Sequence, residues 1–142
     1  MDEGSIIRDL VERVIKNSYS PYSNFKVASA VICRDGRIFT GVNVENSSYG
    51  LSICAERVAI FKAVSEGCRD LAKVYITSDH EQPIPPCGAC LQVISEFSSR
   101  GDVEIVMISQ RGDIVRRRLN DMLPTRFGGG FLKKRSSYSG SE

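Results

Sequence analysis

The chain has few of the residues and runs that would assign it to several large protein classes. Its 142 residues include one histidine and no tryptophan, and no apolar run approaches the ~20 residues that a membrane-spanning helix needs. No stretch at its start has the form of a secretory signal peptide. We therefore expect a soluble protein of the cytoplasm without a membrane partner.

The chain also lacks a strong excess of charge of either sign. Lys and Arg number 19 and Asp and Glu 17, which gives a net charge of +2. So small a charge gives the surface no overall preference for nucleic acid. With 42% hydrophobic residues, the chain can bury one core. We expect one domain over residues 1–127 and a flexible tail rich in Gly, Ser and basic residues over 128–142.

The five cysteines are an odd number, and nothing marks the chain for secretion. In a reducing compartment, such cysteines are expected to be metal ligands, catalytic groups or buried hydrophobic residues rather than disulfides. Cys33 and Cys68 fit the last of these classes. Because the only histidine is His80, in a proline-rich loop, a zinc site in this chain has to rely on thiolates.

Hydrophobic periodicity predicts an alternation of helices and strands. Helices are expected over residues 6–16, 52–67 and 90–97, and strands over 25–33, 37–45, 72–77, 103–108 and 114–119. The order α-β-β-α-β-α-β-β predicts an α/β fold, a three-layer α/β/α sandwich on a mixed five-stranded sheet. On the strand over 37–45, Asn43 and Glu45 share a face, although such polar residues usually face solvent.

Two short motifs each open a predicted helix. Cys54-Ala55-Glu56 begins the helix over 52–67, and Pro86-Cys87-Gly88-Ala89-Cys90 begins the next. A helix N-terminus lowers the pKa of a thiol, and cysteines at i and i+3 face the same way. Three sulfurs from two such helices can hold one tetrahedral ion. The fourth position stays open for water, which is typical of catalytic zinc.

Two residues beside the first ligand suit such a centre. Glu56 is well placed to shuttle protons for a zinc-bound water. Three thiolates on Zn²⁺ sum to −1, and Arg57 can offset that charge by hydrogen bonding to sulfur. A Cys-x-x-Cys pair alone fits a redox or structural zinc site equally well, but the upstream Cys-Ala-Glu favours catalysis.

Over about residues 5–127 the sequence resembles the cytidine deaminases of the small homotetrameric, zinc-dependent type. The matching stretches are Y-S-P-Y-S-N-F-K-V, G-V-N-V-E-N-S-S-Y-G, C-A-E-R and P-C-G-A-C. Zinc deaminases share the pattern of a ligand-x-Glu followed by Pro-Cys-x-x-Cys. These motifs occur in the order and spacing of that family.

The resemblance implies hydrolysis of cytidine and 2′-deoxycytidine to uridine and 2′-deoxyuridine plus ammonia, in pyrimidine salvage. Zinc-bound hydroxide would attack C4, with Glu56 as the proton shuttle. One zinc per subunit would be held by Cys54, Cys87 and Cys90. The residues expected to contact substrate are Phe25 at the base, Asn43 and Glu45 at the ribose hydroxyls, the Ala55 N–H at O2, and Tyr49 and Phe127 from neighbouring subunits of a homotetramer.

Three residues depart from the family's usual pattern: Ser29, Pro85 and Leu91. They leave the chemistry intact and leave fine substrate preference open. One alternative is a related deaminase acting on a blasticidin-type nucleoside or a polynucleotide cytosine. The other is a non-catalytic zinc-stapled binding module, which would have a fourth protein ligand.

Overall fold

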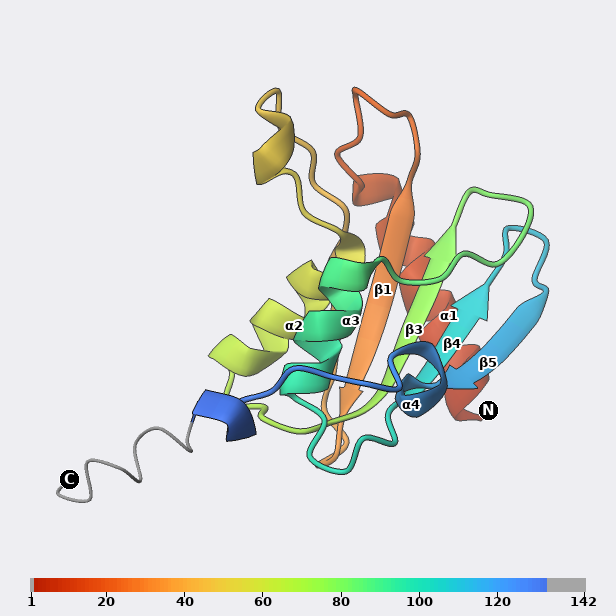
Figure 1. Cartoon of the computed structure of the whole chain (residues 1–142). Helices are drawn as coiled ribbons and strands as arrows, with labels where there is room; N and C mark the ends of the chain where they lie inside the picture. The colour runs from red at the N-terminus through yellow and green to blue at the C-terminus, as the bar shows by residue number, and fades with distance from the viewer. Residues whose placement is uncertain (1, 133–142) are drawn as a thin grey trace, which may run out of the picture.

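A mixed sheet of five strands forms the centre of the protein (Figure 1). The computed structural model describes residues 2–132, and the strands follow the spatial order β2-β1-β3-β4-β5. Their bounds are β1 Val27–Cys33, β2 Ile38–Val42, β3 Leu71–Ser78, β4 Glu104–Ile108 and β5 Ile114–Arg118. β3 and β4 are parallel, and the other neighbouring pairs are antiparallel. The predicted mixed sheet is confirmed.

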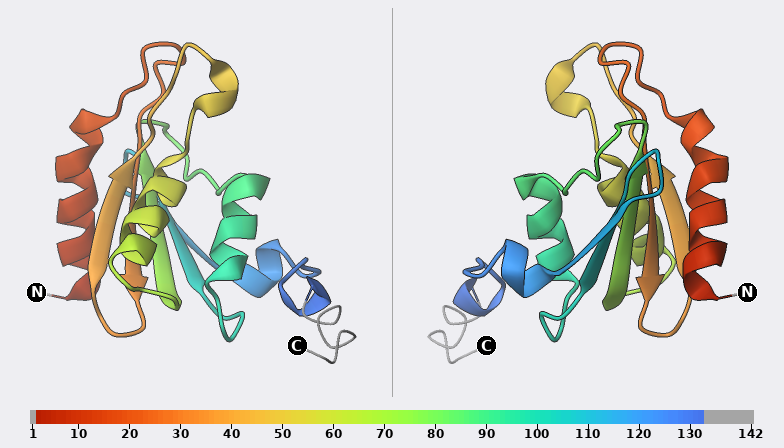
Figure 2. Two further views of the ribbon diagram at one scale, coloured as in Figure 1. Left: turned by 90° about the vertical axis from the view of Figure 1, so that its left-hand side faces the viewer. Right: turned by 90° about the vertical axis from the view of Figure 1, so that its right-hand side faces the viewer.

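Helices cover both faces of this sheet, as Figure 2 shows. α1 (Glu3–Val14) lies on one face, and α2 (Ala55–Ser65) and α3 (Gly88–Glu96) lie on the other. Three short helices complete the fold: η1 (Ile15–Asn17), η2 (Tyr49–Leu51) and α4 (Leu119–Met122). The three-layer α/β/α arrangement is therefore also confirmed. No helix among residues 2–132 has the length and apolar character to cross a membrane.

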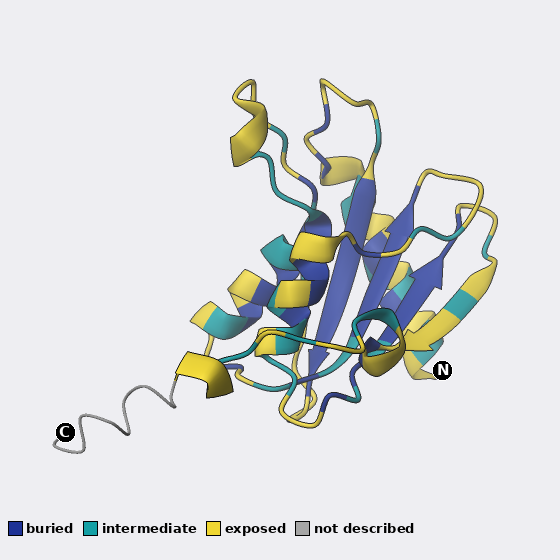
Figure 3. Ribbon diagram, viewed as in Figure 1, coloured by how far each residue is buried: buried dark blue, intermediate teal, exposed yellow. Residues whose placement is uncertain are grey.

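The central strands are buried on both faces, whereas β5 at the edge is largely exposed (Figure 3). Every residue of β1 is buried, because its alternating side chains enter two separate hydrophobic clusters. Ala28 and Ala30 pack with Ile7 and Val11 of α1, while Val31 faces the layer that contains α2 and α3. This double burial makes β1 a rigid support for the segments at either end of it.

The topology brings the first turns of α2 and α3 to one edge of the sheet. β2 and β3 are each antiparallel to β1, so they run in the same direction. α2 follows β2, and α3 follows β3. Both helices therefore begin beyond the carboxyl ends of strands, which is where open α/β sheets form ligand sites.

Helix α2 lies directly against β2 because residue 41 has no side chain. A Cβ atom at Gly41 would be 2.5 Å from the backbone nitrogen of Ala59 and 2.7 Å from the carbonyl oxygen of Ala55. Both atoms belong to the α2 backbone, which cannot rotate away as a flexible side chain could. The absence of a Cβ at Gly41 thus sets the distance between α2 and the sheet.

The second strand of the hairpin ends earlier than the sequence pattern predicted. β2 stops at Val42, so Asn43 and Glu45 lie beyond the strand and do not continue one of its faces. Val44 instead forms isolated bridges to Tyr19 and Ile53. The amide of Asn43 also bonds to backbone groups nearby, and these local bonds replace the regular ladder.

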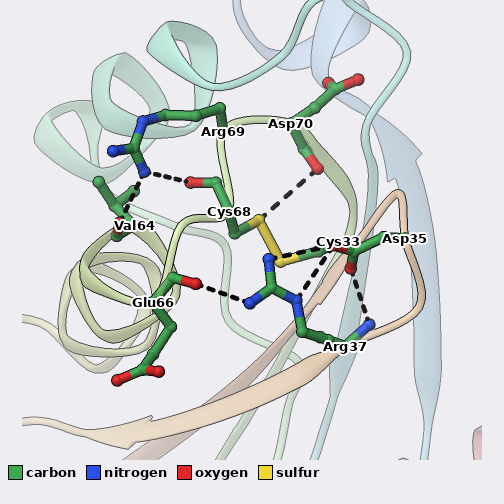
Figure 4. Close-up of polar contacts among 8 residues, drawn as sticks. All are labelled: Cys33, Asp35, Arg37, Val64, Glu66, Cys68, Arg69 and Asp70. Carbon is green, nitrogen blue, oxygen red and sulfur yellow. Dashed lines mark hydrogen bonds and ion pairs between the residues drawn. A yellow bond between two sulfur atoms is a disulfide. The ribbon is translucent and has the colours of Figure 1, made fainter.

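Cys33 and Cys68 form a disulfide, which corrects the expectation that both are unpaired hydrophobic residues (Figure 4). Cys33 ends β1, and Cys68 follows the turn after α2 at Gly67, whose φ is +97°. The fold brings their Cα atoms to 6.3 Å, a separation that a disulfide can span. Both residues are buried. Of the five cysteines, two are therefore paired in a disulfide and three are free.

The start of the expected tail forms a turn. Hydrogen bonds run from Phe131 N to Gly128 O at 3.1 Å and from Leu132 N to Gly129 O at 3.0 Å. The rings of Phe127 and Phe131 stack with their centroids 5.6 Å apart. Residues 133–142 lie outside the described residues, so the flexibility expected for residues 128–142 stays a prediction.

Candidate active site

Three free cysteines meet where α2 and α3 begin. Cys54 is the N-cap of α2 and Cys87 the N-cap of α3, and neither sulfur caps its own helix. Their Sγ atoms are 3.8 Å apart, and the Sγ of Cys90 completes a group in which all three lie within 4.8 Å of one another. The two motifs therefore converge because each helix starts with a cysteine at the same edge of the sheet.

The cluster fits a tetrahedral zinc ion. Two sulfurs bound ~2.3 Å from one tetrahedral zinc lie ~3.8 Å apart, which is the separation between Cys54 and Cys87. Thiolates are ligands that zinc prefers. Among residues 2–132, no fourth His, Cys, Asp or Glu joins the group. Three ligands with one open position are the arrangement of a catalytic rather than a structural zinc site.

The surroundings of Cys54 favour its thiolate form. Hydrogen bonding with Cys90, Arg57 and Cys87 lowers the pKa of Cys54 to about 5, although burial acts in the opposite direction. The Nη2 of Arg57 lies 3.5 Å from this sulfur, and the contact raises the pKa of Arg57. The bond to Cys54 and burial raise the pKa of Cys90. Cys54 therefore favours the thiolate form, with the Arg57 guanidinium beside its sulfur.

Glu56 is the buried carboxyl group beside these sulfurs. Its side chain is 4% exposed and lies in the first turn of α2. Burial raises the pKa of Glu56 to about 7, and the negative charge of Cys54 adds to the shift. A carboxyl group with this pKa gains and loses a proton near neutral pH, which is what a general acid and base requires.

A pocket of 280 Å³ opens in front of the cysteines and Glu56. Its lining is mostly apolar, with a few polar groups at its ends, as is usual for small-molecule sites. The lining residues are Phe25, Val27, Asn43, Glu45, Ser52, Ile53, Cys54, Ala55, Glu56, Ile84, Pro85 and Cys87. Seven of the expected site residues thus line a single cavity: Phe25, Asn43, Glu45, Cys54, Ala55, Glu56 and Cys87. Cys90 lies behind them in the sulfur cluster.

Asn43 is held by three hydrogen bonds at the wall of this pocket. Its Oδ1 accepts from Val27 N at 2.9 Å and from the hydroxyl of Ser18 at 2.5 Å, and its Nδ2 donates to Phe25 O at 2.8 Å. An amide nitrogen has two hydrogens, so one donor of Nδ2 remains for a ligand.

Phe25 contacts the ring of His80 edge-on, with the centroids 6.4 Å apart.

The N–H of Ala55 is available to a ligand for a different reason. Ala55 is the first residue of α2, and the first N–H groups of a helix have no partner within it. The residue itself is buried and lines the pocket. A ligand oxygen at this end of the pocket would also interact with the positive end of the helix dipole.

Two of the expected site residues lie away from this pocket within one chain. Tyr49 is 75% exposed and borders a neighbouring hollow of 360 Å³ with Tyr22, Ser23, Glu45 and Ser52. Phe127 is 58% exposed and lines a surface hollow of 480 Å³ with Phe131. Neither residue lines the pocket in front of the cysteines of its own chain.

Several residues of the site were not predicted from the sequence. Ile53 and Ile84 provide apolar walls of the pocket, and Ser23 binds the carboxylate of Glu45. Isoleucines carry no chemical signature that separates a pocket wall from a core. The run Ser20-Pro21-Tyr22-Ser23-Asn24 is, however, rich in turn-forming residues, and this was the signal available for Ser23.

Comparisons with known proteins agree on one family. The profile described as "Cytidine and deoxycytidylate deaminase zinc-binding region" matches residues 5–107. A cytidine deaminase of Halalkalibacterium halodurans is 40% identical over 127 residues, which are 89% of this chain and 95% of that protein. A probable cytidine deaminase of Dictyostelium discoideum is 42% identical over 120 residues, 84% of this chain and 80% of that one.

Solved structures give the same result for the fold. The crystal structure of cytidine deaminase from Burkholderia pseudomallei aligns with a TM-score of 0.82 at 40% identity, over 89% of this chain and all of that one. Cytidine deaminase from Mycobacterium tuberculosis aligns with a TM-score of 0.76 at 34% identity, over 90% of this chain and 99% of that one.

Proposed function

The chain belongs to the cytidine and deoxycytidylate deaminase family, and from this premise we propose which of its residues perform the reaction and on which substrates. The protein is a zinc-dependent hydrolase that converts cytidine to uridine and ammonia. We extend the substrates to 2′-deoxycytidine, and the pathway to pyrimidine salvage. The observation that carries the assignment is a single pocket that borders a three-sulfur cluster and contains a buried carboxyl group and polar groups for a sugar.

Cys54, Cys87 and Cys90 hold the zinc in this proposal. When bound, zinc lowers the pKa of a water molecule so that it can act as a nucleophile near neutral pH. Arg57 donates to the sulfur of Cys54 and offsets part of the negative charge of three thiolates. Cys90 is buried, Cys54 is half-buried and Cys87 is exposed at the mouth of the site.

Glu56 moves the protons of the reaction. The carboxylate takes a proton from the attacking water and delivers it to N3 of the pyrimidine while the new C4–O bond forms. It then transfers the second proton of that water to the amino group, the C4–N bond breaks, and ammonia leaves. Glu56 is suited to both transfers because its carboxyl group lines the same pocket as the metal-binding sulfurs and is shielded from solvent.

The rest of the pocket orients the nucleoside. Phe25 packs against the base, the Ala55 N–H donates to O2, and Asn43 and Glu45 bind the ribose hydroxyls. No Lys or Arg is among the described residues that line the pocket, whereas the Glu45 carboxylate is. Within one chain, the pocket therefore offers no cation to a phosphate on the sugar. This favours free nucleosides over nucleotides or polynucleotides.

We also propose that the domain of residues 1–127 works as a homotetramer in the cytoplasm. Tyr49 and Phe127 are exposed aromatic residues outside their own chain's pocket, which supports a role in closing the sites of neighbouring subunits. Mixing Glu56→Gln with Phe127→Ala protein tests this directly. If the subunits exchange and share sites, some hybrid sites combine an intact Glu56 with an intact Phe127. The mixture should then exceed the summed activity of its components.

The decisive test is uridine formation from cytidine by the zinc-loaded protein, with Glu56→Gln as the parallel control. We expect turnover by the wild type and a ~10²–10⁴-fold loss in the variant, which keeps its zinc. Cytidine 5′-monophosphate and a blasticidin-type nucleoside, supplied separately, test the substrate class. Equal turnover by Glu56→Gln would refute the proton shuttle, and preference for the phosphate or the antibiotic would refute the substrate assignment.

A further inference from the structure

The segment before β1 folds into a tight turn that surrounds the carboxylate of Glu45. The backbone N–H groups of Tyr22 and Ser23 donate to Oε1 of Glu45 at 3.0 and 3.1 Å. The hydroxyl of Ser23 donates to Oε2. Both carboxylate oxygens are therefore bound by one turn that lies 22 residues earlier in the sequence.

The turn is itself held in one conformation. Asn24 has a φ of 62°, in the left-handed region that Asn tolerates better than most residues, and its N–H bonds to Ser20 O at 2.9 Å. The hydroxyl of Ser23 accepts from Phe25 N at 3.0 Å while it donates to Glu45. Ser23 thus links the residue proposed for the base to the residue proposed for the ribose.

The hydroxyl matters because a glutamate side chain is flexible when unbound. Glu45 is partly exposed and forms no ion pair of 4.0 Å or less among the described residues. The hydrogen bond from Ser23 is the main cause of a lowered pKa of Glu45. A fixed, ionised carboxylate loses less conformational entropy when it accepts a hydrogen bond from a ligand.

We propose that Ser23 is a positioning residue that acts through Glu45 and so sets the affinity for the sugar hydroxyls of the substrate. The inference rests on the proposed function, because it takes Glu45 as the group that binds the ribose. Ser23 does not touch the reacting atoms. Its removal should therefore weaken substrate binding without slowing the chemical step.

The first experiment compares Ser23→Ala with wild type on cytidine and on 2′,3′-dideoxycytidine, which lacks both ring hydroxyls. We expect KM for cytidine to rise about tenfold, the effect of one hydrogen bond to a charged group, with kcat changed less than twofold. Kinetics with the dideoxynucleoside should be unchanged. Ser48→Ala is the matched control, because Ser48 is exposed on a nearby loop and its hydroxyl has no partner among the described side chains.

A double-mutant cycle with Glu45→Ala tests the route of the effect. If Ser23 acts through Glu45, the double variant has the same KM for cytidine as Glu45→Ala alone. Ser23→Thr should restore most of the affinity, because it keeps the hydroxyl. Thermal unfolding of each variant shows whether the turn still folds. The ratio of the KM for cytidine to the KM for 2′,3′-dideoxycytidine does not change when a uniform fraction of the protein is unfolded.

Two results would overturn the inference. One is an equal effect of Ser23→Ala on both substrates, and the other is an effect that persists in the Glu45→Ala background. Either would mean that the hydroxyl acts through Phe25. Failure of the proposed function looks different: the wild type leaves cytidine unchanged, or Glu45→Ala itself does not discriminate between the two nucleosides.

Discussion

Helix α2 connects two groups of cysteines, one free to bind metal and the other joined in a disulfide. At its N-cap, Cys54 has a free sulfur whose pKa is lowered to about 5, beside Cys87 and Cys90. After its last turn, Cys68 is bonded to Cys33. The 11 residues of α2 span ~16 Å, so one helix length separates a metal site from a covalent cross-link.

The environment of each sulfur explains the difference. Cys54 lies at a helix N-terminus, where unpaired N–H groups and Arg57 favour a thiolate that can bind metal, and Cys87 caps the neighbouring helix beside it. At the other end of α2, carbonyl groups predominate, and the Sγ of Cys68 lies 3.7 Å from Asp70 O (Figure 4). There Cys68 meets Cys33 at the end of β1, and the two sulfurs are buried in a disulfide. The residues that the fold places beside each sulfur therefore distinguish the two ends of α2.

Loss of a ligand at the zinc end should have the largest effect. In Cys87→Ala we expect zinc content and cytidine turnover to fall below detection, together with a loss of thermal stability, because metal binding stabilises only the folded state. Metal analysis and turnover on the same preparation measure both. Stoichiometric zinc in this variant would contradict the ligand set.

Loss of the cross-link should be a smaller effect of a different kind. The double variant Cys33→Ser/Cys68→Ser opens a link between residues 35 apart, so we expect the free energy of unfolding to fall by ~2–4 kcal/mol. Urea unfolding measures this value. Zinc content and kcat should stay as in the wild type, and treatment of the wild type with a thiol reductant should reproduce the loss of stability. A parallel loss of zinc would show that the two ends are not independent.

The smallest effect is expected from a charge beside the cross-link. The carboxylate of Asp35 bonds to Nε of Arg37 at 3.0 Å and to its N–H at 3.1 Å, and these bonds lower the pKa of Asp35. A carboxyl group with a lowered pKa stabilises the fold above its ordinary pKa and loses this contribution as the pH falls through the lowered value. Asp35→Asn should therefore lower Tm slightly at pH 7.

The pH dependence of that small effect is the sharper measurement. The difference in Tm between Asp35→Asn and wild type should shrink as the pH is lowered from about 5 to about 3, since the wild-type carboxyl group then becomes neutral as well. A difference that grows in acid would contradict the assigned direction. Turnover at neutral pH should be the same in both proteins.

The two ends also differ in how far the sequence could predict them. The zinc cluster was predictable because each ligand lies at the start of a helix and because the spacing Cys87–Cys90 places two sulfurs on one side. The disulfide was not predictable, since it depends on the length of α2 and on the pairing of β1 with β3. Neither quantity is encoded in the residues near Cys33 or Cys68.

Asn43 and Glu45 show an intermediate case. The pattern identified both residues, yet it placed them on a regular strand that in fact ends at Val42. Their positions depend on hydrogen bonds from Ser18 and Ser23, more than 20 residues earlier in the chain. Local propensity cannot anticipate such long-range side-chain bonds, whereas the alternation of hydrophobic residues was sufficient for the layers of the sandwich.

The close contact at Gly41 makes the reaction centre vulnerable at a position with no chemical function. A methyl group there would meet the backbone at Ala59 and Ala55, and α2 would have to move together with Cys54 and Glu56 at its start. In a saturation library selected for cytidine turnover, we expect position 41 to tolerate no other amino acid, alanine included. Purified Gly41→Ala should show a kcat at least tenfold lower, because small displacements of catalytic groups are costly. Substitutions at Gly41 would then abolish turnover because they displace α2, and not because Gly41 contacts the nucleoside.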